Sequence, residues 1–500
     1  MTTRVAAELG VDISTSELAL AVRDAAGNQG YVSTPMRGAT CWQNDAAFPG
    51  FDLQQLPVMF AELLEKLETD GWKFDASGRV SVSCRQHDMV LLDGNGQMLL
   101  PALSWQCNAA TKEVAWLREQ GVEEHVGPIA ERFVLPKLRC VLQRDASLAN
   151  RIGTVFLTGD WLAWSLTGAR TLSSSDAVSN GLLTQRTRLK ADQAFATAGF
   201  SSEWFPAVAR SGEIVGEVQP PAATDRTWHA IKQRLQGWSF VAGLGDNHAS
   251  AVGCGMTDDY RTMVVSAGTS GTINFACARD TASSLTGKSL RFEFYDRGTL
   301  LLQMLADCAD WYNRFLAQLP AADRSSHENL NRLASSSPPT ALRRVLHDDR
   351  RHTEEFPGNW DSMPLGEQVA STQFSIMLEL LLRVRDMLSE LPPSSVATFV
   401  LTGGISQSEF FQQVFRAGME ILAPGADVKV SDRKGPLRYK TSAYGAMVNA
   451  SMPKHGGKLS NIHAMPGQFP LRECAVADPA VGKQIKYLLR SYGIEAANER

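Results

Sequence analysis

Two aspartates at the ends of apolar, strand-like runs are the residues best placed to do chemistry. Asp12 lies at the end of the first such run, and Asp246 follows a later run and a glycine pair, at the predicted start of a helix. A carboxylate at a strand end can accept a proton from a substrate hydroxyl, and it can also hold Mg²⁺ through water. Because aspartate also caps helices and turns, these residues alone leave a catalytic and a structural interpretation open.

Short turns of glycine, serine and threonine form a second group of candidates. Such turns bring backbone N–H groups together without obstruction by side chains, and hydroxyl groups add donors, so the turns can bind phosphate. The residues concerned are Ser14, Thr15, Ser16, Gly268, Thr269 and Ser270. Most turns of this kind only reverse the chain, which is the alternative. The sequence contains no G-x-x-x-x-G-K-[ST] motif, so a P-loop is excluded.

The elements that must position these turns are two similar hairpins. Apolar runs at 5–13 and 17–24 flank the first turn, and runs at 262–266 and 272–276 flank the second. The pattern of strand, small-residue turn and strand therefore predicts one β-hairpin in each half of the chain. Their separation of about 250 residues is too long for a solenoid repeat and favours a duplicated lobe. Coincidence is the alternative, because hairpins are common.

Helices and strands alternate elsewhere. Apolar residues at helical spacing predict helices over 56–67 and 368–391, and alternating residues predict a strand over 79–84. Two prolines directly after the second helix end it. This alternation indicates an α/β layered fold.

A glycine pair joins a strand to a helix late in the chain. The strand is predicted over 397–402, Gly403 and Gly404 follow it, and a helix is predicted over 406–419. Such a turn commonly brings backbone close to a nucleotide. Residues 320–365 lack periodicity and are interpreted as an exposed insertion or connecting loop. Residues 452–500 have only a weak helical pattern, and we assign them no role.

Composition excludes several classes of protein. The chain has 500 residues, of which 44% are hydrophobic and 20% charged, so global disorder is excluded. Lysine and arginine total 49 against 53 for aspartate and glutamate, and the resulting net charge of -4 argues against nucleic acid or a membrane as partner. The eight cysteines include no C-x-x-C pair, and no segment approaches the ~20 apolar residues of a membrane span. We therefore predict a cytoplasmic protein with free thiols.

Five motifs occur in a fixed order along the chain. They are Gly10-Val-Asp-Ile-Ser-Thr-Ser, Gly243-Leu-Gly-Asp-Asn-His-Ala, Ser266-Ala-Gly-Thr-Ser-Gly, Leu401-Thr-Gly-Gly-Ile-Ser and Ser442-Ala-Tyr-Gly-Ala-Met. Together they resemble the nucleotide and catalytic motifs of the FGGY carbohydrate kinases, with the nearest likeness to the xylulokinases. The resemblance implies an α/β fold of two actin-like (ribonuclease H-like) lobes with a nucleotide cleft between them. The sugar-side lobe would span residues 1–247 and the nucleotide-side lobe residues 248–500.

The resemblance also implies an activity and a role for single residues. The chain would use ATP and Mg²⁺ to phosphorylate a hydroxyl of a small carbohydrate, either a ketose such as xylulose or a related sugar or polyol. Asp246 would be the general base, and Asp12 and Asp246 would hold the metal. Both small-residue turns would contact phosphates. The residues expected beside the adenosine are Gly403, Gly404 and Ser408, and those expected at the sugar are Gln86, His87, Trp105 and Asn247.

The chain departs from the family pattern at several of these positions. Ser14 stands where the family usually has glycine in the first phosphate turn. Cys107 and Ala109 replace an aspartate and an arginine that would bind sugar hydroxyls. Arg85 and Asp88 stand where the family tends to have neutral residues, and our hypothesis is that they restore polar contacts to the sugar.

Two other functions remain open at this point. An actin-like ATPase would use the same fold to act on a protein partner. A catalytically weak relative would bind a sugar without phosphorylating it. The sequence leaves the assembly open, including a homodimer.

Overall fold

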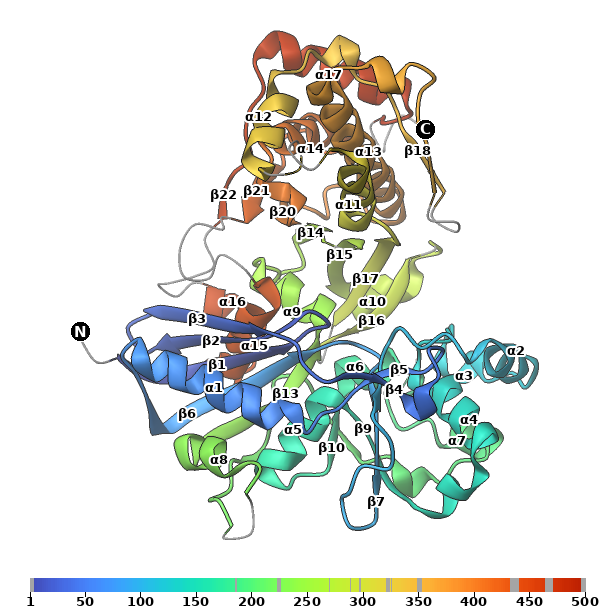
Figure 1. Cartoon of the computed structure of the whole chain (residues 1–500), viewed down its shortest axis with the longest axis vertical. Helices are drawn as coiled ribbons and strands as arrows, with labels where there is room; N and C mark the ends of the chain where they lie inside the picture. Colours follow the sequence, from blue (N-terminus) through green and yellow to red (C-terminus); the bar gives the residue numbers. More distant parts are fainter. Residues whose placement is uncertain are drawn as a thin grey trace. The chain divides into compact units, whose positions relative to one another are not determined.

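The computed structural model describes residues 4–184, 187–222, 226–268, 270–287, 289–295, 298–320, 324, 326–348, 353–431, 440–463 and 471–495. The chain forms two compact units (Figure 1). Unit 1 takes its described residues from 1–253, 292–297 and 434–468, and unit 2 takes the remainder. The predicted boundary lay after residue 247, and the chain leaves unit 1 after Gly253. Unit 1 also contains the described residues of the segment 434–468, from near the end of the chain. The sequence did not indicate this return of the chain to unit 1.

Unit 1 is built on two sheets, of which the first is mixed and the second is antiparallel. The first has the strand order β12-β13-β6-β1-β2-β3, and the second has the order β4-β5-β8-β7-β9. The strands of the first are β1 (Arg4–Ile13), β2 (Glu17–Asp24), β3 (Gln29–Pro35), β6 (Trp72–Cys84), β12 (Ile214–Glu217) and β13 (Ser239–Gly245). The strands of the second are β4 (Ala39–Cys41), β5 (Pro49–Phe51), β7 (Met89–Asp93), β8 (Ala102–Leu103) and β9 (Ile152–Leu157). A further pair joins β10 (Thr171–Ser173) and β11 (Ala207–Ala209).

Helices surround these sheets, and α1 and α15 both pack on the first sheet (Figure 1). The predicted helix over 56–67 is confirmed as α1. The helices of unit 1 are α1 (Gln55–Thr69), α2 (Thr111–Glu119), α3 (Glu123–Val126), α4 (Val134–Arg144), α5 (Thr158–Thr167), α6 (Ser174–Val178), α7 (Asp192–Ala198), α8 (His229–Leu235), α9 (Asp246–Gly253), α15 (Thr441–Ser451) and α16 (Leu459–His463).

Alternation along β1 determines which residues meet α15. Successive side chains of a strand point to opposite faces of the sheet. Leu9, Val11 and Ile13 are buried in the apolar core of unit 1. Gly10 lies on the other face, where a Cβ atom would be 2.1 Å from the carbonyl oxygen of Ala443 in α15. Only glycine allows this close approach, and Asp12 shares that face with Gly10.

One large sheet has the strand order β16-β17-β15-β14-β20-β21-β22, and its strands lie in unit 2 except for residues 292–294 of β16, which are counted in unit 1. Its strands are β14 (Thr262–Ala267), β15 (Gly271–Ala278), β16 (Leu290–Phe294), β17 (Gly298–Leu305), β20 (Thr398–Gly403), β21 (Asp427–Ser431) and β22 (Leu471–Glu473). A separate hairpin joins β18 (Leu346–Asp348) and β19 (Thr353–Glu355). The helices are α10 (Arg279–Ser284), α11 (Ala309–Gln318), α12 (His327–Ser336), α13 (Leu365–Glu390), α14 (Glu409–Leu422) and α17 (Pro479–Ser491).

Two segments of unit 2 are more ordered than the sequence indicated. The interpretation of 320–365 as a loop is wrong in part, because α12 lies within it and Leu330 and Trp360 join the core. Residues 452–500 contain α17, whose Ile485 and Leu489 are fully buried in the same core. In both helices only a few side chains face the core, so the apolar periodicity in the sequence is short.

The two units repeat one topology. In unit 1, β1 pairs antiparallel with β2 and parallel with β6. In unit 2, β14 pairs antiparallel with β15 and parallel with β20. Both predicted hairpins are therefore confirmed, and the duplicated-lobe interpretation and the α/β fold class are supported by the same strand order in each unit.

Two observations bear on the chemical setting. All eight cysteines are free thiols. Within the part of the chain that the structure describes, every helix is too short or too polar to cross a membrane.

Candidate active site

Three strands of unit 1 end at the same edge of its first sheet. Ile13 of β1 is in register with Cys84 of β6, and Cys84 is in register with Gly245 of β13. The three strands are parallel, so the residues that follow them meet at one edge, where α/β proteins commonly bind ligands. This register brings Asp12, the loop after Cys84 and Asp246 to the same edge, as a catalytic role for both aspartates requires.

Asp12 is fully buried at this edge. Its Oδ1 accepts a hydrogen bond of 2.8 Å from the hydroxyl of Ser83. Its Oδ2 is buried and accepts no hydrogen bond, although the Lys440 ammonium lies 3.8 Å away. Burial raises the pKa of Asp12 above its usual value, and the charge of Lys440 opposes this rise. The orphaned oxygen is the kind of atom that a cation or a donor from a ligand would satisfy.

Asp246 is the first residue of α9, as predicted, and it is half-buried. The backbone N–H of Asn247 donates to its Oδ1 at 2.8 Å. Burial raises the pKa of Asp246 to about 7, and the negative charge of Asp12 contributes to the rise. Around neutral pH the carboxylate is therefore poised to gain or lose a proton, which suits a general base.

A directional chain of hydrogen bonds orients the side chain of Gln86. Nε2 of His248 lies 2.8 Å from the carbonyl oxygen of Glu293, which can only accept, so Nε2 carries the proton. Nδ1 of His248 then accepts from Nε2 of Gln86 at 3.4 Å. Oε1 of Gln86 in turn accepts from Nδ2 of Asn247 at 3.3 Å. Burial lowers the pKa of His248 to about 4, so the imidazole stays neutral and the chain keeps its direction.

Gly245 and Asp176 complete this part of the edge. A Cβ atom on Gly245 would lie 2.4 Å from Nε2 of Gln86 and 2.5 Å from Oδ1 of Asp176, so only glycine fits. Burial raises the pKa of Asp176 to about 7, and the thiol of Cys84 donates to its Oδ2 at 3.3 Å. Its Oδ1 is buried and has no hydrogen-bond partner in the structure.

His87 is held in a strained position. Its φ is +73°, in the left-handed region that side chains other than glycine rarely adopt. The buried ammonium of Lys137 donates to the carbonyl oxygens of His87 at 2.6 Å and of Ser104 at 2.9 Å, which holds this backbone. Burial lowers the pKa of Lys137 to about 8. A left-handed residue that is held by a buried cation indicates a loop with a fixed shape.

The His87 imidazole is oriented as well as held. The ring stacks on Phe133 with centroids 4.8 Å apart, and Nδ1 lies 3.1 Å from Oδ1 of Asn180. Nδ2 of Asn180 donates to the carbonyl oxygen of Asp176, which fixes Oδ1 of Asn180 as the acceptor. Burial lowers the pKa of His87 well below its usual value. The ring is therefore neutral with its proton on Nδ1, and Nε2 can accept a hydrogen bond.

Arg85, Asp88 and Trp105 form a closed ring of contacts with the first turn. Nε of Arg85 donates to Oδ2 of Asp88 at 2.5 Å, and the backbone N–H of Trp105 donates to Oδ1 of Asp88 at 2.9 Å. The indole N–H of Trp105 reaches Oγ1 of Thr15 at 3.1 Å, and Nη1 of Arg85 reaches the carbonyl oxygen of Ser14 at 3.0 Å. Both oxygens of Asp88 are thus engaged by the protein. The pair therefore braces the first turn, and its hypothesised contacts to the sugar stay a prediction.

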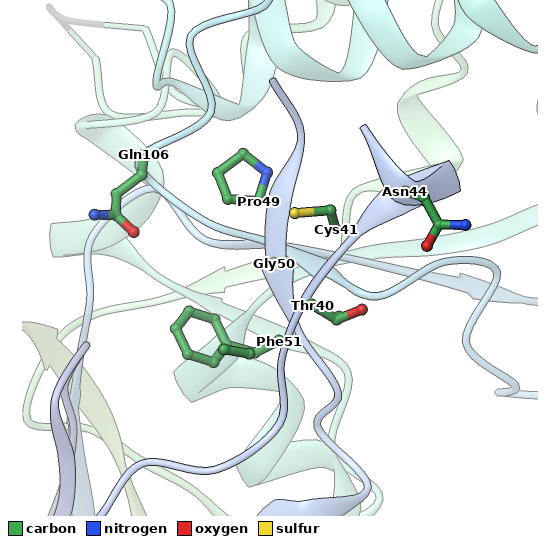
Figure 2. A pocket seen from close by; sticks show the side chains of 8 residues that line it. Thr40, Cys41, Asn44, Pro49, Gly50, Phe51 and Gln106 are labelled. Atoms are coloured by element: carbon green, nitrogen blue, oxygen red, sulfur yellow. The ribbon is translucent and has the colours of Figure 1, made fainter. Parts of the chain in front are cut away.

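A surface pocket of about 490 Å³ lies next to this ring of contacts (Figure 2). It is lined by β4, β5 and Gln106, the residue after Trp105. Phe51 contributes to its wall, and the guanidinium of Arg85 lies 3.7 Å from the centroid of the same Phe51 ring. Cys107 is buried and Ala109 carries no polar group, so neither supplies a charge here.

The first small-residue turn is shaped by its own hydroxyl. Oγ of Ser14 donates to the carbonyl oxygen of Glu17 at 2.8 Å and accepts from Nζ of Lys440 at 3.1 Å. The φ of Ser14 is not positive, so the serine adopts this turn without backbone strain. Thr15 and Ser16 are exposed and can contact a ligand.

Unit 2 brings its predicted residues together at the matching edge. Ala267 of β14 is in register with Gly403 of β20, so the turn at Gly268 and Ser270 lies beside Gly403 and Gly404. Gly403 has a φ of +105°, and a Cβ atom there would be 2.2 Å from the carbonyl oxygen of Ala267. The residue between Gly268 and Ser270, Thr269, lies outside the described residues.

Ser408 stabilises the start of α14 at this edge of unit 2. It is buried and is the N-cap of α14. Its hydroxyl accepts from the backbone N–H of Phe411 and donates to Oε1 of Gln373. Its role beside a nucleotide stays a prediction.

Sequence reasoning missed Lys440 and Lys137. Lys440 lies two residues before the Ser442-Ala-Tyr-Gly-Ala-Met motif, so a basic residue at the start of that small-residue helix was the available signal. Lys137 offered no signal, since a lysine in an amphipathic helix is usually exposed. Within the described residues, no group of three or more histidine, cysteine or acidic side chains could hold a metal ion.

Comparison with known proteins shows that part of the chain is similar to one family. Residues 34–253 match the N-terminal domain of the FGGY family of carbohydrate kinases. The xylulose kinase of Klebsiella pneumoniae is 29% identical over 251 residues, which are 48% of this chain and 50% of that protein. The xylulose kinase of Streptomyces rubiginosus is 26% identical over 380 residues, which are 73% of this chain and 74% of the relative.

The fold is shared with solved structures. The crystal structure of xylulose kinase from Rhodospirillum rubrum has a TM-score of 0.78 at 20% identity and covers 97% of both chains. The predicted resemblance to the FGGY carbohydrate kinases and the predicted fold class are therefore confirmed. The matched part spans only about half the length of the Klebsiella relative.

Proposed function

We propose that this chain transfers the terminal phosphoryl group of ATP to a hydroxyl of a small carbohydrate, because residues 34–253 match the N-terminal domain of the FGGY carbohydrate kinases. The acceptor is a ketose such as xylulose or a related sugar or polyol. The observation that carries the proposal is the carboxylate of Asp246, with a pKa of about 7, at the same strand-end edge as the orphaned oxygen of Asp12.

Asp246 acts as the general base in this proposal. Phosphoryl transfer runs through a loose transition state, in which the attacking hydroxyl loses its proton late. The carboxylate therefore orients the hydroxyl and accepts its proton as the bond to phosphorus forms. A positioned base of this kind contributes about 10²- to 10⁴-fold in rate.

The groups around Asp246 favour a ligand with several hydroxyl groups. Nε2 of His87 is an acceptor, Oδ1 of Asp176 lacks a partner, and Gln86 and Asn247 are oriented by the hydrogen-bond chain to His248. Hydroxyl groups can donate to each of these acceptors. Arg132 lowers the pKa of His87 by its charge and so lies near it. A sugar acid is for that reason a class of acceptor that has to be tested.

The residues at this edge fit Mg²⁺. This ion usually takes one or two carboxylates, with water and substrate phosphates as its other ligands. Asp12 offers an oxygen without a hydrogen-bond partner, and Asp246 offers a half-buried carboxylate, so these two residues would hold the ion. When bound, Mg²⁺ neutralises the charge that develops on the phosphate oxygens. The exposed Thr15 and Ser16 would contact phosphates in unit 1, and Gly268, Ser270, Gly403 and Gly404 would contact the nucleotide in unit 2.

A screen for ADP release over ketoses, aldoses, sugar acids and polyols tests the proposal. We expect ADP release that depends on one class of acceptor, and a loss of about 10²- to 10⁴-fold in kcat for Asp246→Asn with little change in ADP binding. ADP release at the same rate with and without each sugar would favour an actin-like ATPase. Sugar binding without ADP release would favour a non-catalytic relative, and either result would overturn the proposal.

A further inference from the structure

Lys440 is a charged residue at the unit 1 edge to which the proposed function assigns no role. Its Nζ lies 3.1 Å from Oγ of Ser14, 3.3 Å from Oε1 of Glu17 and 3.8 Å from Oδ2 of Asp12. Its charge also lowers the pKa of Asp246, opposing the effect of burial. One ammonium group is therefore close to the first small-residue turn and to both carboxylates.

The position of Lys440 follows from the packing of α15. Lys440 is the residue immediately before α15. This helix packs on β1 at Gly10, and on α9 at Gly445 and Gly253, where a Cβ atom would lie 1.8 and 2.0 Å from backbone oxygens. A hydrogen bond of 2.6 Å between the hydroxyls of Ser250 and Thr441 holds the first turn of α15 against α9. The start of α15, and with it Lys440, is thereby fixed beside the end of β1.

The contacts of this ammonium leave it available to a ligand. The side chain is 23% exposed, and the distance of 3.8 Å to Asp12 is longer than a hydrogen bond. An ammonium has three N–H donors, whereas Ser14 and Glu17 engage two. By comparison, the other cation at the turn, Arg85, is 2% exposed and already paired with Asp88 at 2.5 Å. Lys440 is thus the cation of this group that can reach an incoming anion.

From these contacts we propose that Lys440 binds the terminal phosphoryl group of the nucleotide at the Ser14–Ser16 turn. The inference rests on the proposed function, because it takes that turn to be the phosphate site of unit 1. Without nucleotide the ammonium offsets the charge of Asp12 and Glu17, and with nucleotide it donates to phosphate oxygens. Lysine is suited to this as a compact point charge on a flexible stem.

If Lys440 had only a structural role, its removal would change nucleotide binding in a different way. If Lys440 only neutralised Asp12, its removal would affect every nucleotide alike, or would lower stability alone. A contact to the terminal phosphate would discriminate between ADP and a triphosphate. The comparison of these two ligands therefore separates the two roles.

Calorimetric binding of ADP and of the β,γ-imido analogue of ATP, both with Mg²⁺, tests the inference. We expect Lys440→Met to bind the triphosphate analogue about 10- to 100-fold more weakly, with ADP within about threefold of the unaltered chain. Lys440→Arg keeps the charge and should recover most of the loss. Lys454→Met is the matched control, because Lys454 also lies in unit 1 and pairs with a buried carboxylate, Glu8, at 3.2 Å. It should leave both affinities unchanged.

The outcomes are distinct from those for the proposed function. Equal losses for both nucleotides, or no loss for either, in a folded Lys440→Met variant would overturn the role of Lys440, even if the unaltered chain phosphorylates a sugar. Should Lys440→Met fail to fold, Lys440→Gln and Lys440→Arg provide the same comparison. Conversely, selective loss of the triphosphate analogue supports the inference even if no sugar acceptor is found.

Discussion

The two units present matching strand-end edges with opposite chemistry. In unit 1 the edge carries charged side chains, namely Asp12, Arg85, Asp88, Asp246 and Lys440. In unit 2 the described residues at the corresponding edge are Gly268, Ser270, Gly403 and Gly404, which offer backbone and one hydroxyl. One topology thus supports two kinds of surface. Under the proposed function, we therefore expect proton transfer and charge neutralisation from unit 1, and close contact between backbone and ligand from unit 2.

The largest expected effect tests how far the unit 1 edge depends on charge. Asp88→Ala leaves the guanidinium of Arg85 buried without its partner, since both side chains are at most 2% exposed. We expect the free energy of unfolding, measured with urea, to fall by about 3–5 kcal/mol. The double variant Arg85→Met/Asp88→Ala removes both charges and should recover much of this loss. An Asp88→Ala protein within about 1 kcal/mol of the unaltered chain would contradict a bracing role.

The second prediction concerns pH, to which only the unit 1 edge should respond. In the proposed function Asp246 is the base and must be deprotonated to act, and burial raises its pKa to about 7. The value of kcat/KM should therefore rise with pH and level off above about 7, with roughly a 50-fold loss between pH 7 and pH 5. Initial rates across this range at saturating Mg²⁺ provide the measurement, with far-UV circular dichroism to check that the protein stays folded. A flat profile would remove Asp246 from the role of base.

The third prediction tests the backbone character of the unit 2 edge. Gly403→Ala places a Cβ atom 2.2 Å from the carbonyl oxygen of Ala267 at a φ of +105°. We expect a loss of about 1–3 kcal/mol in stability and weaker binding of ADP. Gly404→Ala is the matched control for stability alone, because a Cβ atom at Gly404 meets nothing within 4 Å and its φ is −61°. Thermal unfolding of both variants and ADP titration of Gly403→Ala would decide, and equal stability of the two variants would argue against this account.

The smallest expected effect sharpens the description of the first turn. Trp105→Phe removes the indole donor to Oγ1 of Thr15, in a side chain that is 40% exposed. We expect the KM for ATP to rise about two- to tenfold with little change in stability. Thr15→Val removes the other partner, so the double variant should be no worse than either single variant. Additive effects would show that the two residues act separately.

Much of the framework could be predicted from the sequence because its patterns are local. Both hairpins, α1 and α13 follow from strand and helix periodicity over many residues. Asp246 at the start of α9 follows from the same kind of pattern. In contrast, α12 and α17 bury only a few side chains each, so their periodicity is too short to recognise.

The finer features of the site depend on tertiary packing. Arg85 and Asp88 were recognised as unusual, but their pairing and the path through Trp105 to Thr15 require the folded loop. Lys440 gains its place only because α15 packs on β1 at Gly10. The burial of Lys137 could not be predicted from the sequence. Its ammonium donates to backbone carbonyl oxygens, and no sequence pattern identifies these acceptors.

The return of α15 to β1 has a consequence for synthesis on the ribosome. Residues up to Gly253 emerge early, yet Gly10 remains uncovered until the segment Thr441–Ser451 has been made. At typical translation speeds of about 5–20 residues per second, this gap of about 200 residues lasts roughly 10–40 s. During that time the nascent first unit exposes an uncovered sheet face to solvent or to chaperones. Truncated chains that stop before residue 441 should accordingly aggregate, even though nearly all of the sheet is already present.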